Sequence, residues 1–473
     1  MARVLFVYTN SLGIPYIDLG LAYLSAVLKQ AGHQVGLVDF TFGLSDAAAI
    51  DQVRAFSPDW IGMTARTNEF ERAVTVARRI KKVMDVPIFC GGMHPTVAAE
   101  DAIARRCFDG ICLGEGEHAT LEVIERMERG EDPTTVKGYW FRKGGEVTRN
   151  DLAPLTPDLD ALPPYDLGLF DFERYLTARD RQLDFITARG CPFKCSYCVD
   201  HTLQEMYRGT GKYTRARSIP GLIDELKEHT ARWKIKRVTI ADEMFNIHKK
   251  RLHEICDAYA SAIGLPFECD LRADCCDESV FKSLSAAGCV KVNIGLESGD
   301  ESLRMGILKK GITDEELTLA FRLARKYGIQ TLSYNIIGLP TETKAQIDKT
   351  IALNRKVKPD SIQCSIFTPY PGTDLHRYAR EHNLLRRADY SNSYYTGTYL
   401  KGPDYTDAEL QLMRTAFAYN CVKEESLPKA LMLLLREVGT PIYAKVGRKI
   451  PPAVNQMIYR LFWHNQTLKF MAK

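Results

Sequence analysis

The chain has 473 residues, of which 45% are hydrophobic and 26% charged, and its formal net charge is +4. This composition is typical of a folded protein of two or three domains, and it excludes a disordered chain and a strongly basic nucleic-acid-binding protein. No apolar run of about 18 residues occurs and the N-terminus is strand-like, so we expect neither a transmembrane helix nor a signal peptide. The thirteen cysteines then indicate a reducing cytoplasm.

Residues 1–148 alternate short apolar runs with helical patterns such as 19–32 and 71–84. This alternation predicts an α/β domain with a Rossmann-like, doubly wound parallel sheet, which residues 137–150 close as a hairpin. Ligands of such sheets bind beyond the carboxyl ends of the strands. The predicted strands are residues 4–9, 34–40, 60–65, 86–92 and 109–117.

Residues 149–180 are proline-rich and lack periodicity, so we expect a linker that crosses the surface. A second alternating series fills residues 181–384 and predicts a partial (β/α)6 barrel, with its chemistry at the carboxyl ends of the strands. Residues 385–473 have mostly helical patterns and form the expected C-terminal segment. The predicted barrel strands begin the stretches 184–190, 237–245, 267–274, 290–299, 332–343 and 361–373.

Three cysteines, Cys191, Cys195 and Cys198, follow the first strand of the predicted barrel in a C-x3-C-x2-C spacing. Three thiolates on one loop can hold an iron–sulfur cluster of the four-iron type and leave one iron for a ligand that is not protein. Two alternatives stay open. One is a zinc loop with a distant fourth ligand such as His201, and the other is a set of unliganded core thiols.

The cysteine spacing, with an aromatic residue before the last cysteine, resembles the radical S-adenosylmethionine (SAM) superfamily. The resemblance extends to "ADEMF", "DLRAD", "IGLESGDESL", "IIGLPTET" and "TPYPGT" at the later strand ends. It implies a 4Fe-4S cluster whose open iron chelates S-adenosylmethionine, and one-electron cleavage to a 5′-deoxyadenosyl radical. The SAM-binding residues that it implies are Tyr197, Asp242, Glu243, Arg272, Glu297, Ser298 and Asn335.

Each of these residues also has a purely structural interpretation. Glu297 is compatible with an ordinary carboxylate at a strand end, and Arg272 with an internal ion pair. Asp242 and Glu243 are compatible with caps of the following helix.

The first domain resembles the cobalamin-binding domains that precede many radical SAM barrels. It departs from them in lacking an Asp-x-His-x-x-Gly motif, so we expect cobalt without a protein imidazole below it, or else a vestigial scaffold. The strand-end histidines His94 and His118 are both compatible with structural roles. The cobalamin-binding residues that the resemblance implies are Thr64, Thr67, Gly91, Gly92, His94, Thr96, Gly114, Glu115 and Gly116.

The resemblance implies an enzyme that methylates an unactivated carbon of a small-molecule, secondary-metabolite or lipid-like substrate. It also implies an external electron donor such as flavodoxin or ferredoxin. One alternative is the same radical in a dehydration, epimerisation, oxidation or ring rearrangement, and another is a non-catalytic metal-binding module. The predicted substrate cavity lies between the two domains and the C-terminal segment, and the residues predicted near its rim are Tyr334, Asn335, Phe367 and Tyr370.

The C-terminal residues 427–473 contain eight lysines and arginines and one acid, Glu437. Basic residues mixed with apolar ones predict an amphipathic helix that contacts a membrane surface. The alternative is a helix that packs on the barrel or on another subunit.

Overall fold

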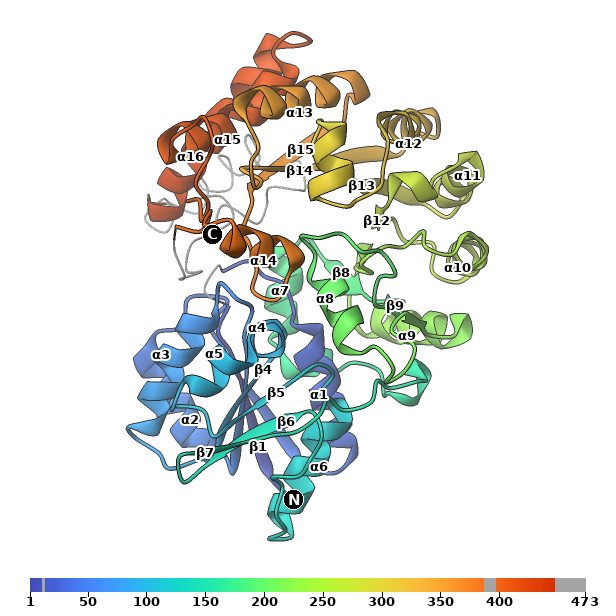
Figure 1. The fold of residues 1–473 in the computed structure, drawn as a ribbon. Coiled ribbons are helices and arrows are strands. Elements are labelled where there is room, and N and C mark those ends of the chain that lie inside the picture. The colour runs from blue at the N-terminus through green and yellow to red at the C-terminus, as the bar shows by residue number, and fades with distance from the viewer. Residues whose placement is uncertain (11–12, 387–396, 447–473) are drawn as a thin grey trace.

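The computed structural model describes residues 1–10, 13–386 and 397–446, with 440–446 as backbone only. Two α/β units lie one above the other, the N-terminal unit in blue to cyan and the second in green to orange (Figure 1). Each is organised around its own sheet. The division into units agrees with the two alternating series in the sequence.

A seven-stranded sheet in the order β2-β1-β3-β4-β5-β6-β7 organises the N-terminal domain. β1 to β5 pair in parallel, and β6 and β7 add an antiparallel hairpin. This confirms the predicted doubly wound sheet and its closing hairpin. The strands are β1 (Arg3–Tyr8), β2 (Gln34–Asp39), β3 (Trp60–Thr64), β4 (Ile88–Gly91), β5 (Gly110–Cys112), β6 (Tyr139–Lys143) and β7 (Glu146–Arg149).

The helices of this domain follow from capping residues and apolar faces. Asp18 and Ser45 accept hydrogen bonds from the first turns of α1 and α2. The helix after β3 buries Phe70, Val74 and Ile80 on one face, as the 3.6-residue period of its apolar residues requires. The helices are α1 (Leu19–Gln30), α2 (Asp46–Phe56), α3 (Phe70–Lys81), α4 (Met93–Val97), α5 (Ala99–Ala104) and α6 (Glu117–Glu128).

The second sheet has six parallel strands in the order β15-β14-β13-β12-β11-β8. Helices connect successive strands, and this open six-unit arrangement confirms the predicted partial barrel. The strands are β8 (Gln182–Phe185), β11 (Arg237–Ile240), β12 (Phe267–Leu271), β13 (Cys289–Glu297), β14 (Gln330–Ile337) and β15 (Ser361–Ile366); the helices are α9 (Ile219–Arg232), α10 (Lys249–Ala262), α11 (Glu278–Ala286), α12 (Asp314–Lys326), α13 (Lys344–Val357) and α14 (Asp374–Glu381).

The segment between the two units is more deeply packed than the expected surface linker. Its apolar side chains, among them Leu159, Tyr165 and Phe170, belong to one buried cluster that contains residues of both sheets. Because proline restricts the chain without making it polar, a proline-rich segment can still bury alternate apolar residues. The short elements here are the 3-10 turns η1 (Leu159–Ala161) and η2 (Leu167–Leu169) and the helix α7 (Phe172–Ala178).

Two further helices, α15 (Asp407–Val422) and α16 (Leu427–Val446), follow the barrel. They pack with β14 and β15 through a cluster that includes Ile337, Ile366 and Phe417. This agrees with the helical C-terminal prediction as far as residue 446, and the rest of the predicted basic segment lies outside the described residues. Within the described ranges, no helix combines the length and apolarity needed to cross a bilayer.

Candidate functional site

The three cysteines lie on a loop between β9 (Ala188–Arg189) and α8 (Val199–Met206). Gly190 enters the loop with φ +84°, and a Cβ there would lie 2.7 Å from the carbonyl oxygen of Tyr213. Ser196 fixes the loop from within, because its N–H donates to Leu308 O at 3.0 Å and its carbonyl accepts from Leu375 N at 3.0 Å. The loop is therefore held against the segments that follow β13 and β15.

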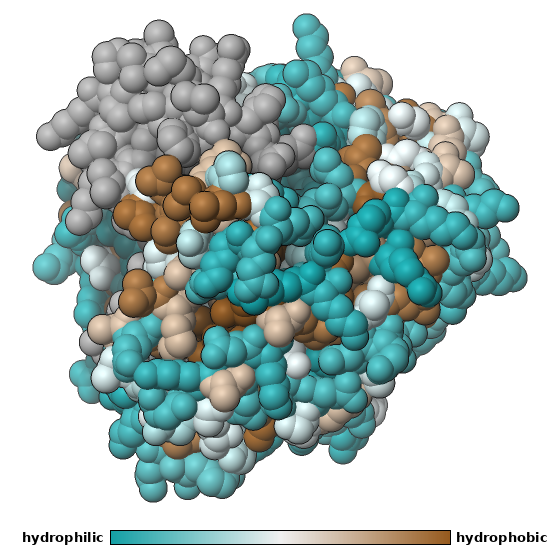
Figure 2. All heavy atoms as spheres, turned by 90° about the horizontal axis from the view of Figure 1, so that it is seen from above, coloured by the Kyte–Doolittle hydropathy of each residue, from teal (hydrophilic) through white to brown (hydrophobic). Residues whose placement is uncertain are grey.

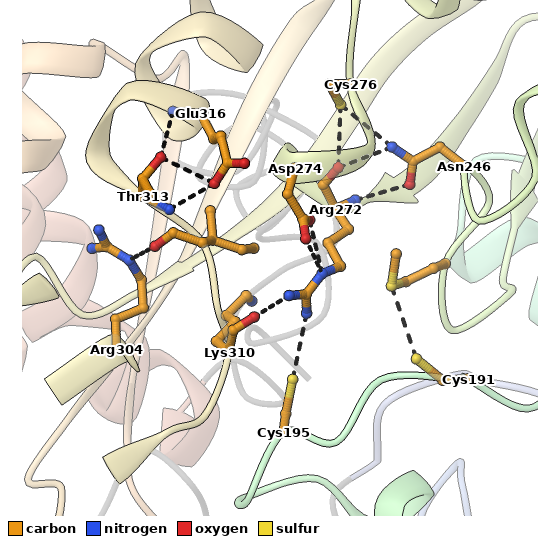
Figure 3. Close-up of polar contacts among 12 residues, drawn as sticks. Cys191, Cys195, Asn246, Arg272, Asp274, Cys276, Arg304, Lys310, Thr313 and Glu316 are labelled. Carbon is orange, nitrogen blue, oxygen red and sulfur yellow. Dashed lines mark hydrogen bonds and ion pairs between the residues drawn. The ribbon is translucent and has the colours of Figure 1, made fainter. Parts of the chain in front are cut away.

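Each cysteine sulfur has a different neighbour, and Figure 3 shows those of Cys191 and Cys195. Cys191 Sγ lies 3.9 Å from the sulfur of Met244, Cys195 Sγ lies 3.5 Å from a guanidinium nitrogen of Arg272, and Cys198 Sγ lies 3.6 Å from a carboxylate oxygen of Asp200. Burial raises the pKa of Cys191 to about 11 and also raises that of Cys198. Buried thiols of this kind ionise when they coordinate a metal, so the loop fits a soft, thiolate-bound cluster.

The imidazole of His201, the fourth ligand in the zinc alternative, is directed elsewhere. Its Nε2 lies 3.6 Å from Asp374 Oδ2 at the start of α14. The structure therefore gives this side chain an ion-pair partner and does not place it as a fourth ligand.

Glu297 ends β13 in the left-handed region, with φ +62°. One of its carboxylate oxygens lies 2.6 Å from Lys310 Nζ and accepts a hydrogen bond from Tyr197 OH at 3.3 Å. The structure thus brings together two of the predicted SAM-binding residues and adds Lys310, which sequence reasoning missed. The only signal for it was a lysine pair shortly after the glutamate motif.

Glu243 and Arg272 also lie near the cysteine loop. Burial and the nearby Asp200 carboxylate raise the pKa of Glu243 to about 8. Glu243 and Asp200 line one cavity, which indicates a site that favours the protonated acid or a cationic ligand group.

Three predicted SAM-binding residues instead have structural partners. Asp242 accepts hydrogen bonds from the backbone of Thr187 and Ala188 at 2.6 and 3.2 Å and so supports the strand that enters the cysteine loop. Ser298 is fully buried and its hydroxyl accepts from the N–H of Asp300. The amide of Asn335 is hydrogen-bonded to Ser333, Asn354 and Gln363 O, which places it against α13.

A cavity of about 440 Å³ separates the N-terminal sheet from the cysteine loop, and the empty space is about 1600 Å³ when its opening to solvent is included. Its barrel side includes Gly190, Tyr207 and Tyr213. The facing wall combines side chains of the strands themselves, among them Phe6, Trp60 and Phe89, with residues at and past the strand ends, where ligands of this fold bind. The predicted cobalamin-binding residues that line it are Thr64, Gly91, Gly92, Thr96, Gly114, Glu115 and Gly116.

Glycine backbone sets the shape of this wall. A Cβ at Gly92 would lie 2.8 Å from Thr64 Oγ1, and one at Gly114 would lie 1.7 Å from the hydroxyl of Tyr207. Both glycines have positive φ, +93° and +73°. Where glycine forms the wall, a large flat ligand such as a corrin can approach the main chain closely, and apolar side chains such as Trp60 and Phe89 line the rest of the cavity.

The other two predicted cobalamin residues, Thr67 and His94, do not line the cavity. His94 is buried, with Nδ1 3.4 Å from Thr67 Oγ1 and Nε2 3.2 Å from Asp101 Oδ2, and its ring packs at a tilt against Phe70, 4.0 Å between ring centres. Both imidazole nitrogens thus have partners inside the domain. Among the described residues that line the cavity there is no histidine.

The loop after β5 is bound directly to the barrel. Glu115 N–H donates to Tyr207 OH at 3.0 Å, and its carboxylate pairs with Arg215 at 2.9 Å. Arg189 lies 3.2 Å from Glu115 and 2.8 Å from Glu117. Burial opposes ionisation of Glu115, but the two guanidinium groups lower its pKa below the ordinary value. Sequence reasoning missed Arg189, Arg215 and Tyr207, since nothing local to them predicts an interdomain contact.

Two family models and several known proteins match this chain. Residues 7–124 match the B12 binding domain and residues 185–353 match the radical SAM superfamily. The uncharacterized methyltransferase PH0819 of Pyrococcus horikoshii is 30% identical over 84% of this chain and 86% of its own length. The anaerobic magnesium-protoporphyrin IX monomethyl ester cyclase of Rubrivivax gelatinosus is 27% identical over 79% of this chain and 69% of its own.

A solved structure of the cobalamin-dependent SAM radical enzyme OxsB, with aqua-cobalamin and SAM bound, has the same fold. It aligns with a TM-score of 0.72 and 17% identity, over 99% of this chain and 76% of that one. The chain therefore belongs to the radical SAM family, in the group with an N-terminal B12-binding domain. It is an enzyme whose cofactors are a 4Fe-4S cluster, S-adenosylmethionine and cobalamin.

Proposed function

We propose that this enzyme transfers a methyl group to an unactivated carbon of a small-molecule substrate. When bound, the cluster and S-adenosylmethionine supply a carbon-centred radical and cobalamin supplies a transferable methyl group. The observation that carries the proposal is that both predicted cofactor sites line one cavity. Gly92 and Gly114 of the N-terminal domain lie on one side of it, and Gly190, Asp200 and Glu243 lie on the other. A substrate there would contact both cofactor sites.

The chain's own side chains have distinct roles in this proposal. Cys191, Cys195 and Cys198 hold the cluster, because soft thiolates suit iron. Tyr197 and Glu297 orient the ribose of S-adenosylmethionine, since a buried carboxylate accepts hydrogen bonds from hydroxyl groups. Asp242 acts indirectly, by fixing the strand that leads to the cysteines.

A second cavity of about 330 Å³ supports a substrate position inside the barrel. It is lined by polar residues of the strands, among them Asp270 and Asn293, and it shares Leu19 and Arg66 with the first cavity. We infer that the substrate extends from the cavity between the two domains into this barrel cavity and contacts the residues of both cavities.

The experiment is anaerobic reconstitution of the full chain with iron, sulfide and cobalamin, followed by incubation with a low-potential reductant and S-adenosylmethionine that carries a deuterated methyl group. We expect 5′-deoxyadenosine, S-adenosylhomocysteine and, with fractionated cell extract as the substrate source, a product heavier by the labelled methyl group. Formation of 5′-deoxyadenosine with an unlabelled product would contradict methyl transfer.

A non-methylating oxidative ring closure is the second candidate, and the similarity to the Rubrivivax cyclase is what favours it. The same experiment separates the two reactions. Ring closure gives a product lighter by two hydrogens and free of deuterium, and it produces no S-adenosylhomocysteine.

We also propose a cytoplasmic location, with flavodoxin or ferredoxin as electron donor. All thirteen cysteines are free thiols, as a reducing compartment requires. Because α16 forms the first part of the basic segment 427–473, we further propose peripheral contact with an anionic membrane. Leu427, Leu431 and Leu435 are exposed on α16, and Figure 2 shows a patch of apolar residues on the otherwise largely hydrophilic face seen from above.

Flotation of the full chain with vesicles tests the membrane contact. We expect binding to vesicles that contain phosphatidylserine, weakened by salt, and loss of binding in L431E. No binding at low salt would contradict it.

A further inference from the structure

Arg272 occupies the turn between β12 and the 3-10 turn η3 (Ala273–Cys275), directly beside the cysteine loop (Figure 3). Asn246, which is fully buried, fixes the backbone of Arg272 on both sides. Its Oδ1 accepts from Arg272 N–H at 3.0 Å, and its Nδ2 donates to Arg272 O at 2.9 Å. The side chain of Arg272 thus starts from a rigid position and is only 6% exposed.

The guanidinium group of Arg272 has a partner on each side. Nε donates to Asp274 at 3.0 Å, Nη2 donates to the carbonyl oxygen of Lys310, and the plane stacks on the Phe193 ring at 3.8 Å. The remaining nitrogen, Nη1, points to Cys195 Sγ at 3.5 Å. These contacts fix the direction of the N–H group that meets the sulfur.

A fixed cation beside a cluster thiolate has a definite electrostatic effect. Reduction adds negative charge to an iron–sulfur cluster, and hydrogen bonds to the sulfurs and nearby charge set its reduction potential. A guanidinium N–H directed at a thiolate stabilises the reduced state more than the oxidised one. The same contacts leave Arg272 less free to reorient toward the methionine carboxylate, the role that the sequence resemblance implies.

We propose that Arg272 raises the reduction potential of the cluster through its contact with Cys195, and that this is its main role in the enzyme. The proposal rests on the proposed function only in taking Cys195 as a cluster ligand. Arg272 therefore eases electron transfer from the external donor before S-adenosylmethionine is cleaved.

The test is a redox titration of the anaerobically reconstituted full chain without S-adenosylmethionine, with the reduced cluster followed by EPR. In R272Q we expect the equilibrium constant for reduction to fall at least tenfold, a downward shift of about 59 mV for one electron. In R272K the shift should have the same sign and be smaller, because lysine keeps the charge but not the planar fork. Iron content confirms that each variant retains the cluster.

The matched control is K309Q, which removes one positive charge from the same loop as Lys310. Lys309 is 59% exposed and lies 3.6 Å from Asp374, so we expect the wild-type potential. A shift in K309Q equal to that in R272Q would overturn the proposal, because the effect would then be one of net charge.

Equilibrium dialysis with labelled S-adenosylmethionine separates the two roles of Arg272. A wild-type potential in R272Q together with weakened cofactor binding would assign the residue to the carboxylate and overturn the proposal. If R272Q loses its iron, R272K becomes the test. A cluster reduction potential of R272K at or above that of the wild type would then overturn the proposal. A wild-type chain that assembles no cluster would overturn the proposed function as well.

Discussion

The cysteine loop of the barrel and the facing edge of the N-terminal sheet differ in the groups that they present, which are side chains in the first and glycine backbone in the second. At the loop, Cys195, Arg272 and Glu297 are side chains with specific polar partners. At the sheet edge, Gly92 and Gly114 present backbone, and the space beside them is the cavity. The first region recognises a ligand by its chemistry and the second by its shape.

This difference determines how each region should respond to substitution. Removal of a functional group should disable the cysteine loop, whereas addition of a single methyl group should disable the sheet edge. The predictions below test that contrast, from the largest expected effect to the smallest.

Cys195→Ala should abolish cluster assembly, because two thiolates cannot replace three. We expect 5′-deoxyadenosine formation to fall by about a thousandfold or more, a loss typical of removing an essential group. Iron content and absorbance after anaerobic reconstitution measure the effect. Cys256→Ala is the control, since Cys256 is a buried core thiol on α10, and retained activity in C195A would refute the assignment.

Gly114→Ala should weaken cobalamin binding at least tenfold, because its Cβ would overlap the Tyr207 hydroxyl at 1.7 Å. Titration with hydroxocobalamin, followed by absorbance, gives the affinity. Gly144→Ala is matched in backbone strain, with φ +60°, but has no atom within 4 Å of the new Cβ. Equal losses in the two variants would show that strain, and not the shape of the cavity, is responsible.

Glu297→Gln should weaken S-adenosylmethionine binding about tenfold, in the range expected for one charge-assisted hydrogen bond. The substitution also removes the anionic partner of Lys310, 2.6 Å away. Equilibrium dialysis measures the affinity, and iron content should stay at the wild-type level. Loss of iron would mean that this residue supports the cluster instead.

His94→Asn should have the smallest effect on the cofactors. Cobalamin affinity should change less than twofold, because both imidazole nitrogens face Thr67 and Asp101 inside the domain. The free energy of unfolding should fall by about 1–2 kcal/mol, the usual range for a lost buried contact. A change in the EPR spectrum of bound cob(II)alamin would instead identify His94 as a cobalt ligand.

The sequence was sufficient to predict both sheets and to place the three cysteines on a loop that follows the first barrel strand. Alternating apolar runs and helical periods specify parallel strands, and functional residues then collect at the strand ends. The glycines of the cavity wall were predictable for the same reason, because they directly follow strands. The spacing of Cys191, Cys195 and Cys198 was enough to make them candidate ligands of an iron–sulfur cluster.

Side-chain direction could not be predicted in the same way. Both faces of a parallel barrel strand are buried, so the two-residue period that separates inside from outside is absent. The sequence therefore predicted Asn335 as a residue that binds S-adenosylmethionine, whereas its side chain is hydrogen-bonded to Asn354 of α13. Lys310 and Arg215 were missed because their partners, Glu297 and Glu115, are reached only through the tertiary fold.

Helix α8 runs from the last cysteine to the loop after β5. It begins directly after Cys198 and ends at Tyr207, whose hydroxyl accepts the Glu115 N–H. Eight helical residues span about 12 Å, so this short helix sets the distance between the cysteine loop and the contact that Tyr207 makes with the N-terminal domain. Inserting one residue would turn Tyr207 by about 100° and lengthen the helix by about 1.5 Å, which would break the contact with Glu115 and shift the cysteine loop relative to the N-terminal sheet.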